Sequence, residues 1–325
     1  MLLAGDIGGT KTLLGLFAPG APRPTPQRVA AFVTIEHESL PALIRRFLDS
    51  GPAATIEAAC LGVAGPVKAQ QAQLTHVPWA VVAADVAAEF ALPSVTLLND
   101  LEAMACAVPV LERSELAPIK PGRPVAGGNA ALIAAGTGLG EALLHVVDGR
   151  PVAFASEGGH ADYSPRTEDE VGLMRALTAR YGRAEWEQVL SGPGLVNIHR
   201  FTHPHGGAAC PASADETLLP AAISRAALDG RCPQCVRALA MFVAAWGAEA
   251  GNLALRAVAT GGVFIGGGIA PKILPALRSP EFLDAFRGKP PMVELLDAIP
   301  VQVIMNEQAA LLGAAVHANR LRAKA

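Results

Sequence analysis

The sequence predicts an α/β protein of two domains, each carrying one glycine-rich loop. At 325 residues the chain has room for about two domains with cores of their own. The glycine loops lie at residues 5–12 and 135–140, and each stands between two short apolar runs. Apolar runs on both sides of a glycine turn indicate β-hairpins, and strands that alternate with segments of helical spacing indicate α/β domains. A glycine-rich hairpin turn at each of two distant places in the chain is typical of two facing domains that hold one nucleotide.

The first domain is predicted at residues 1–110 plus 300–325. In order, it shows strands at 2–4, 13–17 and 29–35, a helix at 40–48 between Ser39 and the stop Gly51-Pro52, a strand at 56–63, and a helix at 83–92. A short buried strand at 95–98 then runs into Asn99 and Asp100, and helical spacing continues over 101–108. Polar side chains at the carboxyl end of a strand stand at the ligand crevice of an open α/β sheet. From the local sequence alone, Asp100 is equally a ligand contact or only the cap of the following helix.

The second domain is predicted at residues 111–299. Residues 109–129 are rich in proline and glycine, which predicts a surface crossing. The elements expected after it are a hairpin at 130–147, helices at 168–181, 194–201, 216–228 and 236–257, and a strand at 263–265 that enters a glycine turn. Pro271 is expected in the first turn of the next helix. A strand at 301–304 and a long helix at 308–322 end the chain, and we expect this helix to pack back on the first domain.

The two glycine loops predict phosphate binding. Glycine lets backbone N–H groups close on an anion and tolerates the positive φ that a concave turn needs. The sequence has no run with P-loop spacing, and Gly136, Gly138 and Gly140 have neither the spacing nor the following helix of a dinucleotide site. A tight hairpin turn would explain either loop alone. The pair, with Asp6 in the first loop, favours a magnesium nucleotide.

Composition argues against nucleic-acid and membrane partners. Hydrophobic residues make up 51% of the chain, charged residues 17%, and the net charge is −3, so an anionic surface is not attracted in bulk. Residues 2–16 are too short and too interrupted by glycine for a signal peptide, and no apolar run reaches the ~20 residues that span a bilayer. We therefore expect a cytoplasmic protein.

The cysteines leave two interpretations open. Five cysteines are few and odd in number, which argues against a disulfide framework. Cys232 and Cys235 form a CxxC pair, and with Cys210, His203 and His205 upstream they could supply a tetrahedral zinc site. The alternative is that the CxxC begins a long helix and carries ordinary buried thiols. The alternative is favoured because the His-Pro-His segment lies in a Gly/Pro-rich loop without a second pair of regular spacing.

Six motifs in order along nearly the whole chain resemble those of bacterial ATP-dependent glucokinases. They are Asp6-Ile7-Gly8-Gly9-Thr10, Asn99-Asp100, residues 135–140, Glu157-Gly158-Gly159-His160, residues 187–195 and residues 261–268. These glucokinases are related to the ROK kinases within the hexokinase/actin-like ATPase superfamily. The resemblance implies two actin-like (ribonuclease H-like) domains around a central cleft, with ATP, Mg²⁺ and glucose as ligands, phosphoryl transfer to the 6-hydroxyl of glucose, and a homodimer.

The resemblance also implies roles for the residues that match. It assigns sugar binding to Asn99, Asp100, Glu157, His160 and Glu187, with Asp100 as the catalytic base. It assigns phosphate and metal binding to Asp6, Gly8, Gly9 and Thr10, with Asp6 as the metal ligand, a second phosphate segment to Gly136, Thr137 and Gly138, and adenosine binding to Gly266, Gly267 and Gly268. Taken alone, Glu187 is better explained as a solvated helix residue, and His160 is as readily a satisfied polar side chain as a ligand.

Three departures from the family pattern stand out. Lys11 follows Gly-Gly-Thr as in ROK kinases, and His76 stands where the family more often has Asn, while Ala161–Pro165 replace the zinc motif that ROK kinases carry after Glu-x-x-His. Two rival functions remain: a kinase for mannose, fructose or an N-acetylated hexosamine, and a sugar-sensing regulator. The regulator is disfavoured because the first hairpin begins at residue 2 and leaves no room for an N-terminal helix-turn-helix.

Overall fold

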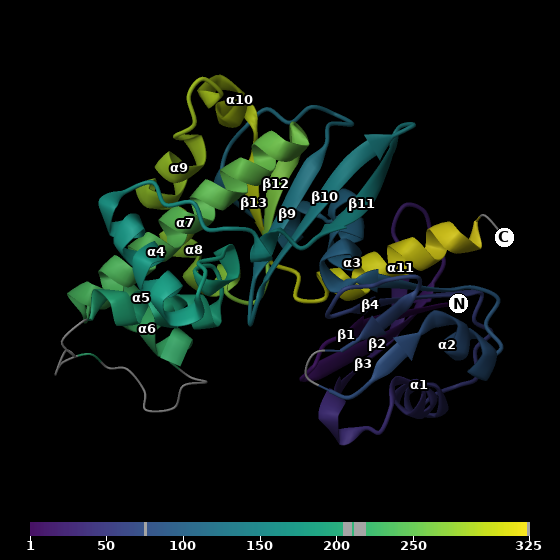
Figure 1. Cartoon of the computed structure of the whole chain (residues 1–325). Helices are drawn as coiled ribbons and strands as arrows, with labels where there is room; N and C mark the ends of the chain where they lie inside the picture. The colour runs from purple at the N-terminus through teal and green to yellow at the C-terminus, as the bar shows by residue number, and fades with distance from the viewer. Residues whose placement is uncertain (75–76, 204–209, 211–218, 324–325) are drawn as a thin grey trace. The chain divides into compact units, whose positions relative to one another are not determined.

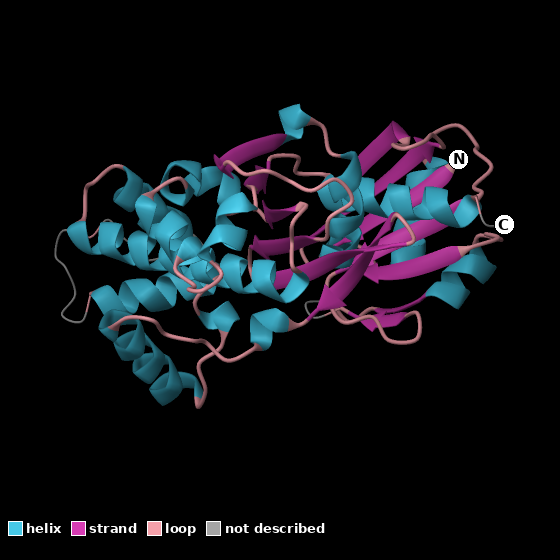
Figure 2. Ribbon diagram, turned by 90° about the horizontal axis from the view of Figure 1, so that it is seen from above, coloured by secondary structure: helices cyan, strands magenta, loops and turns pink. Residues whose placement is uncertain are grey.

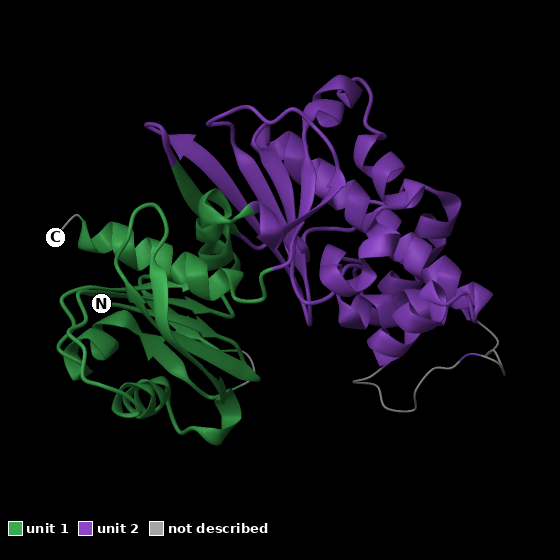
Figure 3. Ribbon diagram, turned by 180° about the vertical axis from the view of Figure 1, so that it is seen from behind, with its two compact units in different colours: residues 1–112, 151–155, 306–325 green, residues 113–150, 156–305 purple. Residues whose placement is uncertain are grey.

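The computed structural model describes residues 1–74, 77–203, 210 and 219–323. These residues form two compact units (Figure 3). Unit 1 comprises Met1–Glu112, Pro151–Ala155 and Asn306–Ala325, and unit 2 comprises Arg113–Arg150 and Ser156–Met305. Their boundaries fall a few residues from those expected at 110 and 300, and the short segment 151–155 was not expected in unit 1. The division of the chain into two domains with these bounds stays a prediction.

Unit 1 is built on a five-stranded sheet in the order β3-β2-β1-β4-β7. Strands β1, β2 and β3 pair antiparallel, while β1, β4 and β7 run parallel. The elements are β1 (Leu2–Ile7), β2 (Lys11–Ala18), β3 (Thr25–Val33), η1 (Thr34–Glu36), α1 (Leu40–Asp49), β4 (Ala58–Val63), β5 (Gln71–Gln73), β6 (Ala80–Val82), α2 (Ala83–Glu89), β7 (Val95–Asn99), α3 (Asp100–Ala107), η2 (Val108–Val110) and α11 (Ala309–Arg322).

Helices cover both faces of this sheet, because successive strand residues point to opposite sides. Leu3 and Leu61 belong to a core that includes α1 and α2, whereas Leu2 and Cys60 belong to a core that includes α3 and α11. Figure 1 shows α3 and α11 together on one side of the sheet and α1 and α2 on the other. The C-terminal helix therefore returns to the first unit, where it packs on α3, β1 and β4.

Unit 2 is built on a six-stranded sheet in the order β11-β10-β9-β12-β13-β8, with helices packed against it (Figure 2). The elements are η3 (Arg113–Glu115), β8 (Leu116–Lys120), β9 (Ala130–Ala135), β10 (Leu139–Val147), β11 (Arg150–Ser156), η4 (Gly158–His160), α4 (Glu168–Tyr181), η5 (Trp186–Gln188), α5 (Gly192–Thr202), α6 (Leu219–Leu228), α7 (Pro233–Ala257), β12 (Gly262–Gly266), η6 (Ala270–Ile273), α8 (Leu274–Leu277), α9 (Pro280–Arg287), α10 (Val293–Ala298) and β13 (Val301–Ile304).

The core of unit 2 gathers around the long helix α7. Its Phe242 and Trp246 are fully buried and belong to the same core as Phe282 and Phe286 of α9. Among the described residues, α7 alone has the length and composition of a membrane-spanning helix, yet 72% of its most apolar window is buried inside the protein. The helix is therefore the central packing element of unit 2.

The structure corrects the expected surface crossing at 109–129. Residues 116–120 form strand β8, which pairs antiparallel with β13 at the edge of the sheet, and the register shifts beside Pro118. An edge position and an irregular register are where a strand tolerates proline, because proline has no N–H to donate to a neighbour. The short hairpin of β5 and β6 was also not expected.

Candidate active site

Three parallel strands of unit 1 end at the same edge of its sheet. The register places Ile7 beside Val63, and Val63 beside Asn99. The first glycine loop, which follows β1, and the Asn99-Asp100 pair, which follows the body of β7, therefore stand at one edge. This is the position at which open α/β sheets bind ligands.

The first glycine loop is braced before any ligand binds. The Gly8 N–H donates to the Lys11 carbonyl at 3.0 Å, which closes the hairpin between β1 and β2. The Thr34 hydroxyl, on η1, donates to the Gly8 carbonyl at 2.7 Å, and it lies 2.9 Å from the Thr12 hydroxyl. Thr10 is exposed at the tip of the turn. The turn thus holds a fixed shape while its tip faces solvent.

Asp6 lies near the end of strand β1, just before the first glycine loop, and its carboxyl is half-buried. Burial raises its pKa to about 6, and the nearby Lys11 ammonium opposes that rise. A carboxylate that has lost much of its hydration gains from a cation, because the cation replaces the missing solvation. Asp6 is therefore a group whose chemistry fits a divalent metal ligand.

The helix cap at α3 is Asn99 and not Asp100. The Asn99 side-chain oxygen accepts from the N–H of Leu101 at 2.9 Å and from that of Glu102 at 3.4 Å, and its amide donates to the Gly65 carbonyl at 3.2 Å. Asp100 is the first helical residue, and its Oδ1 accepts from the Leu101 N–H at 2.9 Å. The N-cap residue of α3 is therefore Asn99, with the Asp100 carboxylate sharing the Leu101 N–H, and the role of Asp100 as the base stays a prediction.

Two of the predicted nucleotide segments are neighbours in unit 2. Strands β9 and β12 run parallel, with Gly266 beside Ala134, so the loops that follow them start side by side. Gly267 has a φ of +85°, and a side chain there would collide with the Ala135 carbonyl. Only glycine meets both conditions at that position. The second phosphate segment and the adenosine segment thus share one edge of the sheet.

Glu187 braces the second glycine loop. It lies on η5, is half-buried, and its Oε2 accepts from the Leu139 N–H at 2.9 Å. A Cβ at Gly138 would lie 2.6 Å from the same oxygen. The Gly192 N–H at the start of α5 donates to the Gly136 carbonyl at 2.8 Å. The sequence alone favoured a solvated helix residue at Glu187, and the structure shows instead a carboxylate held against the loop.

Glu157 and His160 lie at the two ends of η4. Both are exposed, and the His160 N–H donates to the Glu157 carbonyl at 3.0 Å. The His160 Nδ1 lies 3.4 Å from Oε1 of Glu185, and Arg183 donates to the His160 carbonyl at 2.9 Å. One ring nitrogen of His160 and one carboxylate oxygen each of Glu185 and Glu187 lie within 4.8 Å of one another. The structure therefore brings together two of the predicted sugar ligands and one carboxylate, Glu185, that the sequence analysis missed.

Glu141 is a second group that the sequence analysis missed. This β10 side chain is 1% exposed, and its Oε1 has no hydrogen-bond partner among the described residues. Burial, and then the nearby Glu249 carboxylate, raise the pKa of Glu141 to about 8. The carboxyl lies directly against Gly158, in the space that a side chain there would need. The Glu141 carboxyl, whose protonated form is favoured by burial, thus packs against the segment between Glu157 and His160.

Two residues that the sequence analysis singled out lie outside the described residues, namely His76 and His205. Lys11 is exposed at the start of β2. In each unit, the strand registers place the glycine loops of the site at one edge of the sheet.

Known proteins match this chain over nearly its full length. The family model named Glucokinase matches residues 3–321. The chain belongs to the glucokinase family. A glucokinase of Nostoc punctiforme is 37% identical, over 99% of both chains, and a glucokinase of Psychromonas ingrahamii is 36% identical, over 97% of this chain and 96% of the relative.

Solved structures give the same result for the fold. The crystal structure of a glucokinase from an Antarctic psychrotroph has a TM-score of 0.87 and 30% identity, and the match covers 98% of both chains. A ROK family glucokinase from Streptomyces griseus, solved with glucose and AMPPNP, shares the fold at a TM-score of 0.64 and 22% identity, over 98% of this chain and 99% of that one.

These findings confirm the predicted family and the actin-like α/β fold. They also confirm the predicted class of activity, an ATP-dependent hexose kinase. No comparison tests the roles of individual residues.

Proposed function

We propose that this member of the glucokinase family transfers the γ-phosphoryl group of ATP to the 6-hydroxyl of glucose. The observation that carries the proposal is the gathering of Asp6, the first glycine loop, Asn99 and Asp100 at the carboxyl edge of one sheet. Glucokinases that are similar over nearly the full chain support glucose as the acceptor.

Asp100 is the proposed base. The transition state of phosphoryl transfer is loose, so catalysis depends mainly on positioning and on charge stabilisation. The carboxylate at the start of α3 would accept the proton of the sugar 6-hydroxyl as the phosphoryl group arrives. Asn99 caps the helix, and the Asp100 Oδ1 accepts from the Leu101 N–H at 2.9 Å, so backbone and side chain together hold Asp100 at the start of α3.

Glu157, His160 and Glu187 are the proposed sugar ligands of unit 2, with Asn99 and Asp100 in unit 1. Sugar hydroxyls both donate and accept, so carboxylates, amides and an imidazole can hold them in one orientation. Glu187 would couple sugar and nucleotide binding, because its carboxylate also holds Leu139 beside the second glycine loop. Glu185 would orient the His160 ring through its contact with Nδ1.

The nucleotide would be bound by the glycine segments. The tips of the two loops, at Gly8, Gly9 and Thr10 and at Gly136, Thr137 and Gly138, would donate to phosphate oxygens, and Gly266, Gly267 and Gly268 would lie against the nucleoside. Asp6 would hold Mg²⁺, which when bound neutralises charge on the phosphates. We also propose a cytoplasmic homodimer, as the family resemblance implies.

The direct test is steady-state phosphorylation by the purified protein across a panel of sugars and phosphoryl donors, with coupled detection of ADP. We expect the highest kcat/KM with glucose and ATP in the presence of Mg²⁺. A clearly higher kcat/KM with mannose, fructose or an N-acetylated hexosamine would contradict glucose as the acceptor and leave the kinase chemistry intact.

A further inference from the structure

We propose that unit 2 binds one Zn²⁺ ion in tetrahedral geometry through His199, His203, Cys210 and Cys235. This site is separate from the residues proposed for sugar and nucleotide binding, and the proposal does not depend on the kinase function. It also goes beyond the CxxC pair, because the ligand set takes one member of that pair and adds a histidine inside a helix.

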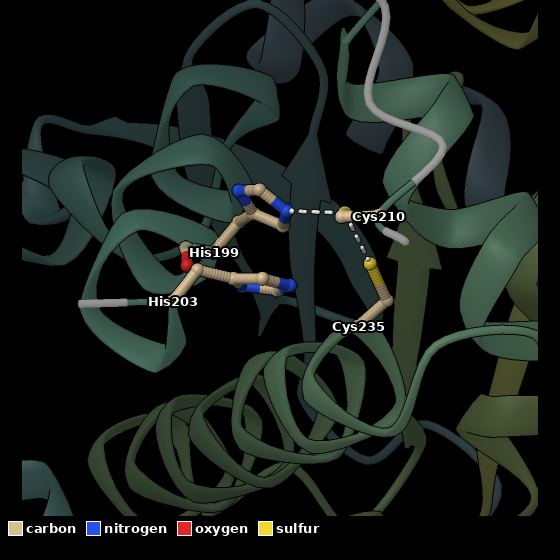
Figure 4. Close-up of side chains that lie close together, drawn as sticks. All are labelled: His199, His203, Cys210 and Cys235. Carbon is tan, nitrogen blue, oxygen red and sulfur yellow. Dashed lines mark hydrogen bonds between the residues drawn. The ribbon is translucent and has the colours of Figure 1, made fainter. Parts of the chain in front are cut away.

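The four donor atoms lie at the separations that one ion requires. All are within 4.8 Å of one another. Nε2 of His199 is 3.2 Å from Sγ of Cys210, which is 3.5 Å from Sγ of Cys235 (Figure 4). With Zn–S and Zn–N bonds of about 2.3 and 2.0–2.1 Å, the edges of a tetrahedral site measure about 3.3–3.8 Å. The side chains therefore need only small adjustments to enclose the ion.

Three separate segments supply these donors. His199 lies in the last turn of α5 and His203 directly follows that helix, so their four-residue spacing places both rings on one side. The rings stack with centroids 3.8 Å apart. Cys235 lies in the first turn of α7, and Cys210 comes from the connection between α5 and α6. Convergence of soft donors from distant segments is typical of a structural metal site.

The backbone fixes the His203 ring in the state that a metal needs. Its Nδ1 is 2.8 Å from the His199 carbonyl oxygen, which can only accept, so in the neutral ring Nδ1 carries the hydrogen and the Nε2 lone pair is available to a metal. Metal-binding histidines almost always donate their other ring N–H to a carbonyl or carboxylate in this way. The contact therefore points to a ligand role and not only to packing.

The donor set selects the metal. Two thiolates and two imidazoles suit zinc, whereas Mg²⁺ and Ca²⁺ prefer oxygen ligands. Binding would release the two thiol protons to solvent and involve no electron transfer. A disulfide between Cys210 and Cys235 is the competing interpretation, but it would give no role to the two imidazoles that converge on the same point.

Zinc at this position would link the end of α5 to the start of α7. The opposite end of α5 touches the second glycine loop, where Gly192 donates to Gly136. The ion would therefore stiffen the support behind that loop without touching substrate. Metal removal should lower the melting temperature strongly and leave the glucose KM within a few-fold of its normal value.

The test begins with elemental analysis of the untagged, reduced, full-length protein. We expect about one zinc per chain, an apparent Kd of about 50 nM or tighter in competition with a chromophoric chelator, and, after exchange, the visible bands of thiolate-bound tetrahedral Co²⁺. His199→Asn and Cys235→Ser should each abolish tight binding. Cys106→Ser, at a buried thiol of unit 1, and Cys232→Ser, at a thiol that contacts His203 but is not assigned as a ligand, should retain it.

A second measurement covers the case in which a ligand variant fails to fold. In the wild-type protein, Zn²⁺ should protect the partly exposed Cys210 from alkylation, and a chelator should make Cys210 reactive. Reduced wild-type protein that binds Zn²⁺ only in the micromolar range and gives no such protection would overturn the proposal. A Cys210–Cys235 disulfide in protein that never binds zinc, or loss of zinc in Cys232→Ser alone, would equally contradict the assigned site.

Discussion

Glu187 would serve two ligands in the proposed site. Its Oε2 accepts from Leu139 beside the second glycine loop, while the same carboxylate is a proposed sugar contact. A change at the loop can therefore disturb sugar binding, and the choice of glycine matters in any test of the nucleotide site.

Gly136 and Gly138 give a matched pair for that test. A Cβ at Gly136 meets nothing within 4 Å, whereas one at Gly138 falls 2.6 Å from Glu187. We expect Gly136→Ala to raise the KM for ATP and leave the glucose KM nearly unchanged, and Gly138→Ala to raise both. Steady-state kinetics with each substrate varied in turn measures the two effects. Equal changes in both constants for both variants would contradict the coupling through Glu187.

Asp6 should set the acidic limb of the pH profile. Its pKa is raised to about 6, so the carboxyl binds a proton, and loses affinity for Mg²⁺, as the pH falls through that value. Lys11→Met removes the charge that opposes the rise, which should shift the limb of kcat/KM for ATP to higher pH. A profile whose acidic limb is identical in Lys11→Met and wild type would show that another group controls it.

Among the elements, α3 should owe part of its stability to the Asn99 cap. Removing the Asn99 side chain should cost about 0.5–2 kcal/mol of stability. Asn99→Asp should keep the cap because Asp accepts the same N–H groups, and should lose only the hydrogen bond that the Asn99 amide donates to the Gly65 carbonyl. Denaturant unfolding of Asn99→Ala and Asn99→Asp measures this difference. Equal free energies of unfolding for the two variants would mean that the cap seen at Asn99 contributes nothing.

The contact between β10 and α7 should give unit 2 a characteristic pH dependence. Glu141 has its pKa raised from 4.5 to about 8, so its protonated form is favoured by folding. A carboxyl whose pKa is higher in the folded than in the unfolded protein stabilises the folded state fully at pH values below its unfolded pKa. This stabilisation is lost as the pH rises through the folded pKa, here between about 4.5 and about 8.

Glu141→Gln should remove this loss, since the amide stays neutral. The melting temperature of Glu141→Gln relative to wild type should rise steadily between pH of about 5 and about 8. Glu38→Gln, at an exposed carboxyl outside the helices and strands, is the control and should follow wild type. A constant difference between Glu141→Gln and wild type across this range would mean that Glu141 is ionised in the folded protein.

Elements with strong periodicity and clear ends could be predicted from the sequence. The helix α4 has the predicted bounds, because Thr167 caps its start and Gly182 adopts the left-handed conformation at its end. Strand β8 could not be predicted, since Pro118 indicates a loop unless the strand is known to lie at a sheet edge. The β5–β6 hairpin was missed because Gln71 and Gln73 are polar and the strands are short.

The site shows the same limit. The glycine loops and Asn99-Asp100 are local motifs, so the sequence could place them at strand ends. The contacts of Glu185, Glu187 and Glu141 join positions far apart in the chain, and nothing in the local pattern indicates them. His199 was missed for a related reason, because it lies inside a helix and not near the CxxC pair.

At the scale of the whole molecule, each unit carries part of the proposed chemistry. Unit 1 holds the proposed base and metal ligand at the edge of β1, β4 and β7, and unit 2 holds the second phosphate segment, the nucleoside segment and three proposed sugar ligands. The buried helix α7 supports the second set, as α11 supports the first. Asp100 at the start of α3 is the group on which the proposed phosphoryl transfer depends.

The Asp100→Asn variant distinguishes a base from a structural residue at this position. Asn99 remains the cap, and the new amide oxygen can still accept from Leu101, so the variant should melt as wild type does. By calorimetry it should bind ATP and glucose with nearly unchanged affinity. Because the amide cannot take the proton, kcat should fall by at least about 100-fold, or roughly 2.7 kcal/mol of barrier. A variant that folds, binds both substrates and phosphorylates glucose within a few-fold of the wild-type rate would contradict the assignment of Asp100 as the base.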